Sequence, residues 1–245
     1  MNKRSDQSIW LALSPLYSVV LGLIASGLMM LLLKHNPIEA FAQLFGYAFR
    51  DMYNVADIFA KATPLILTGL AFGFAFRATL FNIGAQGQFY MGAIAAVFFA
   101  LKLGSLPAIL LLPLCMIAGV VAGAAWGALV GLCKSKFNAN EFLISMMSNY
   151  VAIAIMNFLV RGPLKEAKGE YPQTDVIPET AWIRSLIPGT RFHWGFLVAL
   201  AAALLAYVIL WRTSLGFRIR AVGMNRSAAR YAGIDEKRIF VIVFA

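Results

Sequence analysis

Long runs without a charged residue alternate with short charged segments along this chain. Five of the runs can cross an apolar slab about 30 Å thick as a helix, which takes roughly 20 residues. A sixth run, 62–76, is shorter, and the side chains of Lys61 and Arg77 at its ends can reach toward the headgroups. The pattern predicts an all-α integral membrane protein, a polytopic helical bundle with six spans. The five long runs are 7–33, 78–101, 103–133, 142–160 and 192–211.

A last apolar run, 239–245, reads IFVIVFA and stops where the chain stops. We expect it to be the start of a seventh span. We therefore expect the chain to be truncated at its C-terminus, with further membrane helices to follow. The whole chain, 1–245, is predicted to be a single transmembrane domain that is incomplete at this end.

Composition and charge agree with a membrane protein. The chain is 61% hydrophobic and 13% charged, whereas soluble domains carry about 25% charged residues. The net charge is +10. With the N-terminus inside, more than half of the basic residues, including Lys3 and Arg4, fall in inner segments, as the positive-inside rule requires. The basic balance thus predicts topology and lipid headgroup contact, and it needs no nucleic acid.

Two outer segments are predicted. After the first span, Asn36 can cap a helix whose first position is Pro37, and apolar residues then recur at helical spacing. We expect this amphipathic helix to lie on the outer membrane interface. The segment 161–191 is a long, proline-containing extracytoplasmic loop. Loops of this length are often functional, and a lid, a docking surface and a passive connector all remain open.

Glycines recur every fourth residue in the run 103–133. Such spacing makes a smooth helix face where another helix can approach closely. We predict a role in helix packing, and in a truncated chain we expect this face to lack its partner helix. The four glycines are Gly119, Gly123, Gly127 and Gly131.

Residues 76–96 read FRATLFNIGAQGQFYMGAIAA, an apolar stretch with several polar side chains. Asn82 falls in the predicted inner turn, and Gln86 and Gln88 fall at the start of the third helix. A short span followed by a glycine-interrupted helix start is typical of a broken helix that lines a cavity. Interhelical hydrogen bonding with no contact to a solute is an equally open interpretation.

A second polar stripe follows in NEFLISMMSNYVAIAIMN. Uncharged amides and hydroxyls suit a neutral, hydrogen-bonding solute, whereas ion pumps more often place carboxylates within their spans. We therefore predict a substrate pathway with no catalytic residue and no metal site. The predicted pathway residues are Asn82, Gln86, Gln88, Ser145, Ser148, Asn149 and Asn157.

The most polar inner segment is 212–238. Asn225 can cap a short helix over RSAARYA, Gly233 can end it, and Asp235 can cap the next helix. A short helix held between membrane helices is suited to transmit a push from a partner below the membrane. A basic surface loop is the alternative interpretation.

This segment contains GFRIRAVGMNRSAARYAGI, which resembles the cytoplasmic coupling segment of permease subunits in ATP-binding cassette (ABC) importers, in the branch for sugars, nucleosides and branched-chain amino acids. TPLILTGLAFGFAFRATLFNIGAQGQFYMGAIAA looks like the nucleoside or simple-sugar group of that branch, and FNANEFLISMMSNYVA and PQTDVIPETAWI are similar to nucleoside-type permeases. The resemblance covers roughly residues 60–245. It implies that ATPase coupling involves Gly216, Arg218, Arg220, Gly223, Asn225, Ala228, Ala229 and Gly233.

The resemblance also implies partners: a cytoplasmic ATPase, a second permease subunit of the same or a different kind, and an extracytoplasmic solute-binding protein. The chain would be a multi-pass protein of the bacterial inner membrane with a cytoplasmic N-terminus. It contains no Gly-Lys dipeptide and so no Walker A loop. We therefore expect no enzyme activity and no cofactor in this chain, with ATP used by the partner.

The implied solute is a nucleoside, with a simple sugar as the alternative. A secondary transporter that needs no ATPase and a membrane scaffold or receptor are further alternatives.

Overall fold

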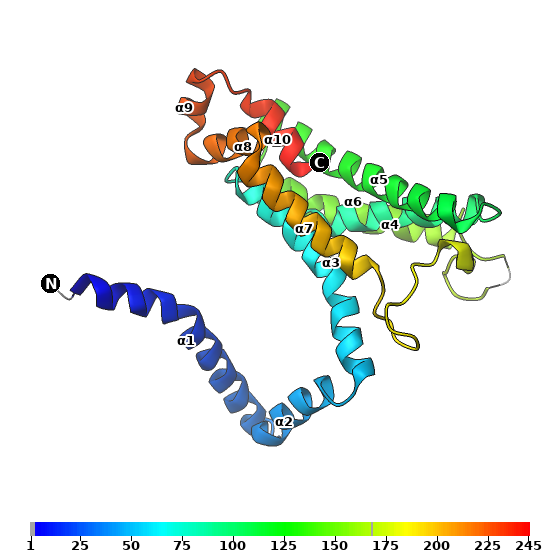
Figure 1. The fold of residues 1–245 in the computed structure, drawn as a ribbon, viewed down its shortest axis with the longest axis horizontal. Helices are drawn as coiled ribbons and strands as arrows, with labels where there is room; N and C mark the ends of the chain where they lie inside the picture. Colours follow the sequence, from blue (N-terminus) through cyan, green and yellow to red (C-terminus); the bar gives the residue numbers. More distant parts are fainter. Residues whose placement is uncertain (1–2, 168) are drawn as a thin grey trace. The chain divides into compact units, whose positions relative to one another are not determined.

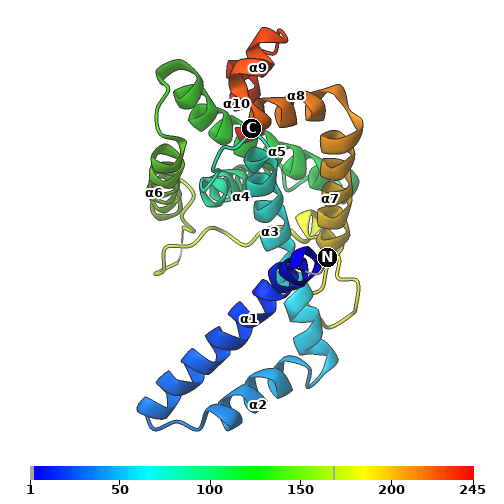
Figure 2. The ribbon, with the colours of Figure 1, turned by 90° about the vertical axis from the view of Figure 1, so that its left-hand side faces the viewer.

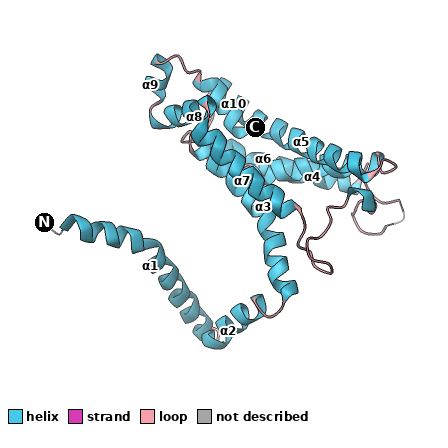
Figure 3. Cartoon of the chain, viewed as in Figure 1, coloured by secondary structure: helices cyan, strands magenta, loops and turns pink. Residues whose placement is uncertain are grey.

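A computed structural model describes the backbone of residues 3–167 and 169–245, and the side chains of residues 16–167 and 169–245. This described part is helical and holds no β-strand (Figure 3); its one β-bridge joins Ser185 and His193 in the long loop. The predicted all-α fold is confirmed. The side chains of Lys3 and Arg4, which entered the charge prediction, lie outside the described ones.

The chain divides into two compact units, Met1–Ile58 and Phe59–Ala245. In the first unit, α1 (Lys3–Leu32) is followed by α2 (Pro37–Ala48), with a bend of 120° between them. The predicted cap is confirmed, because Asn36 Oδ1 accepts a hydrogen bond from the N–H of Ile38 at 3.0 Å. No residue of α2 is buried within its unit, which leaves the apolar face of this amphipathic helix exposed.

Helix α3 (Met52–Phe76) begins in the first unit and ends in the second. The expected short span is wrong, because the helix is 25 residues long and begins well before Lys61. Asp57 and Lys61 lie one turn apart on this helix, a spacing at which opposite charges are neighbours. The predicted span began after Lys61 because charged residues were taken as span boundaries, so it included only the last part of this helix.

The second unit contains the remaining helices (Figures 1 and 2). Helix α5 packs against α4 along one part of its length and against α10 along another, and α4 also packs against α6. A single 3-10 turn, Glu179–Ala181, interrupts the long loop. The helices are α4 (Ala85–Lys102), α5 (Ala108–Phe137), α6 (Glu141–Arg161), α7 (Gly195–Arg212), α8 (Ser214–Met224), α9 (Arg226–Tyr231) and α10 (Glu236–Phe244).

Each of the six predicted spans overlaps a helix, and the chain is a multi-pass membrane protein. In the described part, four helices (α3, α5, α6 and α7) are long and apolar enough to span a bilayer, and Leu16–Leu32 with α2 makes a fifth if that bent pair is one span. Helix α4 is not among them, because Gln86, Gln88 and Lys102 lower its mean hydropathy. The structure thus supports four or five of the six predicted spans.

The connections of the second unit gather at two ends. The turn 77–84 and helices α8 and α9 lie at one end, and the loop 162–194 lies toward the other (Figure 1). This separation agrees with the predicted alternation of inner and outer segments. At the first end, a buried hydrophobic core joins the turn to α5 and to the last three helices. Its residues are Ala75, Ala78, Leu80, Val130, Ile219, Val222, Ala229, Ile239, Phe240, Val243 and Phe244.

Candidate functional site

The turn 77–84 connects α3 to α4 at the place predicted for an inner turn. Asn82 is 3% exposed, and its Oδ1 accepts a hydrogen bond from the N–H of Gly84 at 3.1 Å. Its Nδ2 donates to Oε1 of Gln88 at 3.3 Å. Thr79 in the same turn has φ +56°, and a β-branched residue seldom adopts this left-handed conformation. The turn therefore holds one strained residue and one buried amide with partners on both sides.

Asn149 fastens the start of α4 to α6. Its Oδ1 accepts a hydrogen bond from the N–H of Gly87 at 2.8 Å, and its Nδ2 donates to the carbonyl of Ile83 at 2.9 Å. The first N–H groups of a helix have no partner within the helix, so Asn149 caps α4 from a neighbouring helix. An added Cβ at Gly87 would lie 3.0 Å from that Oδ1 and 3.0 Å from Trp126 Nε1. A side chain at this position would therefore need Asn149 and Trp126 to shift by a few tenths of an ångström.

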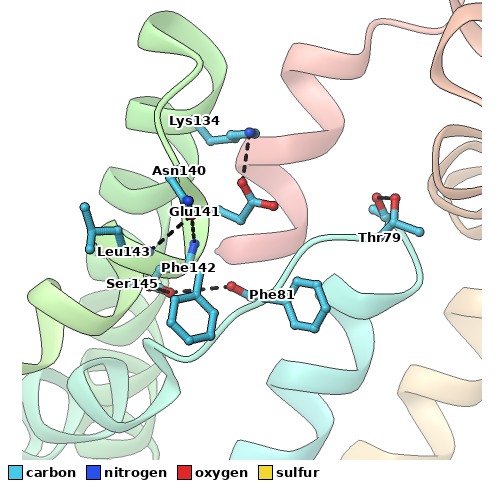
Figure 4. Close-up of polar contacts among 9 residues, drawn as sticks. Thr79, Phe81, Lys134, Asn140, Glu141, Phe142, Leu143 and Ser145 are labelled. Atoms are coloured by element: carbon cyan, nitrogen blue, oxygen red, sulfur yellow. Dashed lines mark hydrogen bonds and ion pairs between the residues drawn. The ribbon is translucent and has the colours of Figure 1, made fainter.

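Further polar contacts extend from this cap. The Ser145 hydroxyl, fully buried, contacts the carbonyl of Phe142 at 3.1 Å and that of Phe81 at 3.5 Å, so that α6 faces the turn (Figure 4). Ser148 donates to the carbonyl of Ser145 at 2.7 Å. Gln88 Nε2 donates to the carbonyl of Phe244 in α10. The turn, α4, α6 and α10 are thus joined through one polar cluster.

The predicted pathway residues separate into two groups. Five of them belong to this cluster, but Gln86 is exposed and its Nε2 donates to the hydroxyl of Tyr90 at 3.1 Å, while Asn157 is exposed two turns beyond Asn149. The predicted broken helix is wrong: α4 is continuous, with Gly84 as its N-cap and Gly87 in its first turn. The amides of Asn82 and Asn149 bond to protein groups, which favours the interhelical interpretation at these two residues.

A buried ion pair closes the α5–α6 connection. Lys134 Nζ lies 2.9 Å from Glu141 Oε2, and the two side chains are 10% and 17% exposed (Figure 4). The chain reverses between them because Asn138 adopts φ +47° and Asn140 caps α6. The sequence reading missed this pair, although opposite charges on either side of the Asn-containing turn were a usable signal. Within the described ranges, no group of His, Cys, Asp or Glu is placed to hold a metal ion.

The local structure predicted for 212–238 is confirmed at its caps. Asn225 Oδ1 accepts from the N–H of Ala228 at 3.0 Å, Gly233 has φ +78°, and Asp235 Oδ1 accepts from the first N–H groups of α10. Helix α8 was not predicted. Thr213 caps it by accepting from the N–H of Gly216 at 3.2 Å.

Helix α8 rests directly on the turn 77–84. An added Cβ at Gly223 would overlap the carbonyl oxygen of Arg77 and lie 3.2 Å from Ala78 Cα. Ile219 and Val222 on the same helix are fully buried in the core that includes Ala78. Only glycine allows the two backbones to approach this closely, so α8 and the turn form a tight contact.

The predicted coupling residues lie on two sides of the α8–α9 segment. Gly216, Gly223 and Ala229 face the rest of the unit; an added Cβ at Gly216 would overlap the carbonyl of Ile209, and Ala229 is buried. The other side is exposed, with Tyr231 at 95% and Met224 at 88%. Its predicted coupling residues are Arg218, Asn225, Ala228 and Gly233, while the remaining one, Arg220, is half-buried.

The glycine face of α5 is covered along its length, so the expectation that it lacks a partner helix is wrong. An added Cβ would lie 3.2 Å from the Gly92 carbonyl at Gly119 and 3.2 Å from the Gln88 carbonyl at Gly123. At Gly127 it would overlap the Phe244 carbonyl, and at Gly131 it would lie 2.7 Å from Val241 Cα. Helix α4 thus covers one half of the face, and α10 covers the other.

Comparison with known proteins gives a family and several relatives. The family model described as branched-chain amino acid transport system / permease component matches residues 54–245. The chain is 34% identical to the glucose ABC transporter permease protein TsgB13 of Haloferax volcanii, over 100% of this chain and 67% of that protein. It is 36% identical to the guanosine ABC transporter permease protein NupP of Bacillus subtilis, over 92% of this chain and 65% of that protein.

A further relative is the nucleoside ABC transporter permease protein NupB of Lactococcus lactis, 32% identical over 94% of this chain and 65% of that protein. The chain therefore spans about two thirds of the length of these curated relatives. No solved structure matches the chain.

Proposed function

The chain belongs to the family of branched-chain amino acid transport system permease components, and from this premise we propose that it is a membrane-spanning subunit of an ATP-driven importer. It is accordingly a transport subunit rather than an enzyme. The observation that carries the proposal is the contact of α8 with the turn 77–84 at Gly223. This contact gives a partner at the exposed side of α8 and α9 a short route to the membrane helices.

We propose a nucleoside as the solute. Two of the three relatives named above are called guanosine or nucleoside permeases. The segment 142–160, which forms most of α6, contains no carboxylate and presents one exposed amide, Asn157, as suits a neutral polar solute rather than an ion. A simple sugar is the second candidate, because the glucose permease of Haloferax volcanii aligns with the whole chain at 34% identity.

The proposed assembly places a cytoplasmic ATPase against the exposed side of α8 and α9. This orientation puts the N-terminus in the cytoplasm and the loop 162–194 on the outer side, where a solute-binding protein would deliver the solute. The loop is anchored for such a role, since Ile177 and Ala181 pack on the buried Ala100 and Leu111 of the α4–α5 hairpin. A second permease subunit, identical or related, would complete the pathway in the inner membrane.

Coupling would follow the contacts described above. When the ATPase closes on its nucleotide, it would displace α8 and α9 as one body. Because α8 meets the turn backbone to backbone at Gly223 and Arg77, there is no long side chain between them to absorb the displacement. The turn is also hydrogen-bonded to α6, because its Ile83 carbonyl accepts from Asn149. A movement of α8 would therefore reach α4 and α6 together, as in a shear of packed helices.

Uptake of labelled solute tests the proposal. The chain would be expressed with its ATPase and binding protein, both as it is and joined to the part of the guanosine permease relative that it does not span, and uptake of labelled guanosine and glucose would be compared. We expect guanosine uptake that unlabelled inosine inhibits and glucose does not. An ATPase with its Walker lysine replaced should abolish uptake. Uptake that persists with this inactive ATPase would refute the importer assignment, and preference for glucose would refute only the solute.

A further inference from the structure

Two arginines and a tryptophan meet where two membrane helices end. Arg77 directly follows the last residue of α3, and Trp211 lies in the last turn of α7. Both helices are long and apolar enough to span a bilayer. Arg77 Cζ lies 5.4 Å from the centre of the Trp211 ring, and Arg220 Cζ of α8 lies 4.7 Å from it. The cluster therefore lies at the depth where phospholipid headgroups begin.

The cluster carries two positive charges that no carboxylate balances. Among the described residues, neither Arg77 nor Arg220 forms an ion pair, and Nη1 of Arg220 is buried without a hydrogen-bond partner. Both guanidinium groups lie within about 6 Å of one ring, the range of a cation–π contact, so two positive charges share one aromatic side chain. An anion bound at this ring would balance their charge.

The surroundings of the cluster are apolar and exposed. Trp211 is 47% exposed, Phe76 at the end of α3 is 50% exposed, and Phe217, one turn from Arg220 on α8, is 61% exposed. Tryptophan is enriched at the membrane interface because its ring is apolar and its N–H is polar. A free phosphate or an acidic protein segment would use the charges alone, whereas a phospholipid offers both a phosphate and acyl chains.

We propose that Arg77, Trp211 and Arg220 form a binding site for the phosphate headgroup of an anionic phospholipid of the phosphatidylglycerol or cardiolipin type. Arg77 belongs to the turn 77–84, and Arg220 belongs to α8, whose Gly223 rests on the Arg77 carbonyl. A lipid held by both guanidinium groups binds across this contact and ties α8 to the turn. The anionic lipid content of the membrane thus adjusts how firmly the two are joined.

Fluorescence quenching by brominated lipids tests the site. The full chain would be placed in phosphatidylcholine nanodiscs with increasing brominated phosphatidylglycerol or brominated phosphatidylcholine. The Trp211 signal is the difference between the wild type and Trp211→Phe. We expect brominated phosphatidylglycerol to quench Trp211 at a lower mole fraction than brominated phosphatidylcholine does. Arg77→Gln should weaken this preference about fivefold, and Arg77→Gln/Arg220→Gln should weaken it about fivefold further.

The matched control is Lys136→Gln/Arg218→Gln, which removes two charges from the same end of the unit but none from the ring. It should keep the preference. An equal loss in this control, or no preference in the wild type, would overturn the proposal. If glycerol phosphate abolishes the quenching preference, the site binds free phosphate instead. If Arg77→Gln weakens binding of the ATPase but leaves the quenching unchanged, the cluster is a protein contact. If the double variant misfolds by circular dichroism, the exposed Arg77→Gln single variant decides.

Discussion

Asn149 and Gln86 carry the same kind of amide group but lie in opposite surroundings. Asn149 is 8% exposed and satisfies the Gly87 N–H and the Ile83 carbonyl, both of which belong to the backbone around the start of α4. Gln86 is exposed and bonds only to Tyr90 one turn further along its own helix. A buried group that loses its partner costs about 1–3 kcal/mol, whereas an exposed one is satisfied by water.

We therefore expect Asn149→Leu to lower the free energy of unfolding by about 2–4 kcal/mol, because it leaves two buried backbone groups without a partner. Gln86→Leu should change it by about 0.5 kcal/mol or less. Denaturant unfolding of the two variants in the same detergent measures the difference. If the two variants are equally stable but only Asn149→Leu fails in transport, then the amide of Asn149 serves a solute and the cap is secondary.

Caps within one segment were predictable from the sequence, and caps between segments were not. Asn36, Asn225 and Asp235 each accept from N–H groups two or three residues further on, so their function follows from local order along the chain. Asn149 caps a helix 62 residues away. Its function depends on how α4 and α6 pack, and the spacing of polar residues along α6 carries no information about that packing.

At the scale of the elements, α5 is the helix on which α4 and α10 pack. Because its glycines carry no side chain, the backbones of α4 and α10 come within contact distance of the α5 backbone. Gly73 on α3 differs, because an added Cβ there would meet nothing within 4 Å. The glycines of α5 thus represent glycine at a helix contact, and Gly73 represents glycine on an open helix surface.

Gly127→Ala should lower the free energy of unfolding by about 1–3 kcal/mol, because the new methyl group would overlap Gln88 Nε2 and the Phe244 carbonyl, and the helices must move apart. Gly73→Ala should leave it unchanged or raise it by up to about 1 kcal/mol, as alanine favours the helix. Thermal melting in one detergent compares the two variants. Equal stability of the two would contradict the packing assigned to α5.

Each of the six spans predicted from the sequence overlaps a helix, but features that depend on charge context were missed. The α3 helix was cut short at Lys61, because a charged residue was read as a helix boundary although it lies on the side of a continuous helix. Helix α8 was interpreted as a polar segment, because Gly216 and Gly223 lower its helix propensity and Arg218 and Arg220 interrupt its apolar pattern. Those glycines are explained by the contacts that α8 makes with α7 and with the turn.

At the scale of the whole molecule, we propose that α8 and α9 drive the membrane helices through the turn 77–84. The contact at Gly223, the buried core around Ala78 and Leu80, and the bond from Asn149 to Ile83 form one continuous connection. The solute, the partners, the orientation and the truncation of the chain stay predictions. The connection itself lies within one compact unit and needs none of them.

The most direct test is the number of solute molecules imported per ATP hydrolysed. It is measured in proteoliposomes that contain the ATPase, the binding protein and whichever form of the chain, alone or fused, imports solute in the uptake assay. Gly223→Ala places a methyl group against the Arg77 carbonyl and separates α8 from the turn. Gly69→Ala on α3, where an added Cβ meets nothing within 4 Å, is the matched control. We predict that Gly223→Ala keeps ATP hydrolysis but lowers import per ATP at least about tenfold, which corresponds to roughly 1.4 kcal/mol of lost coupling, while Gly69→Ala keeps the wild-type ratio. A wild-type ratio in Gly223→Ala would contradict it.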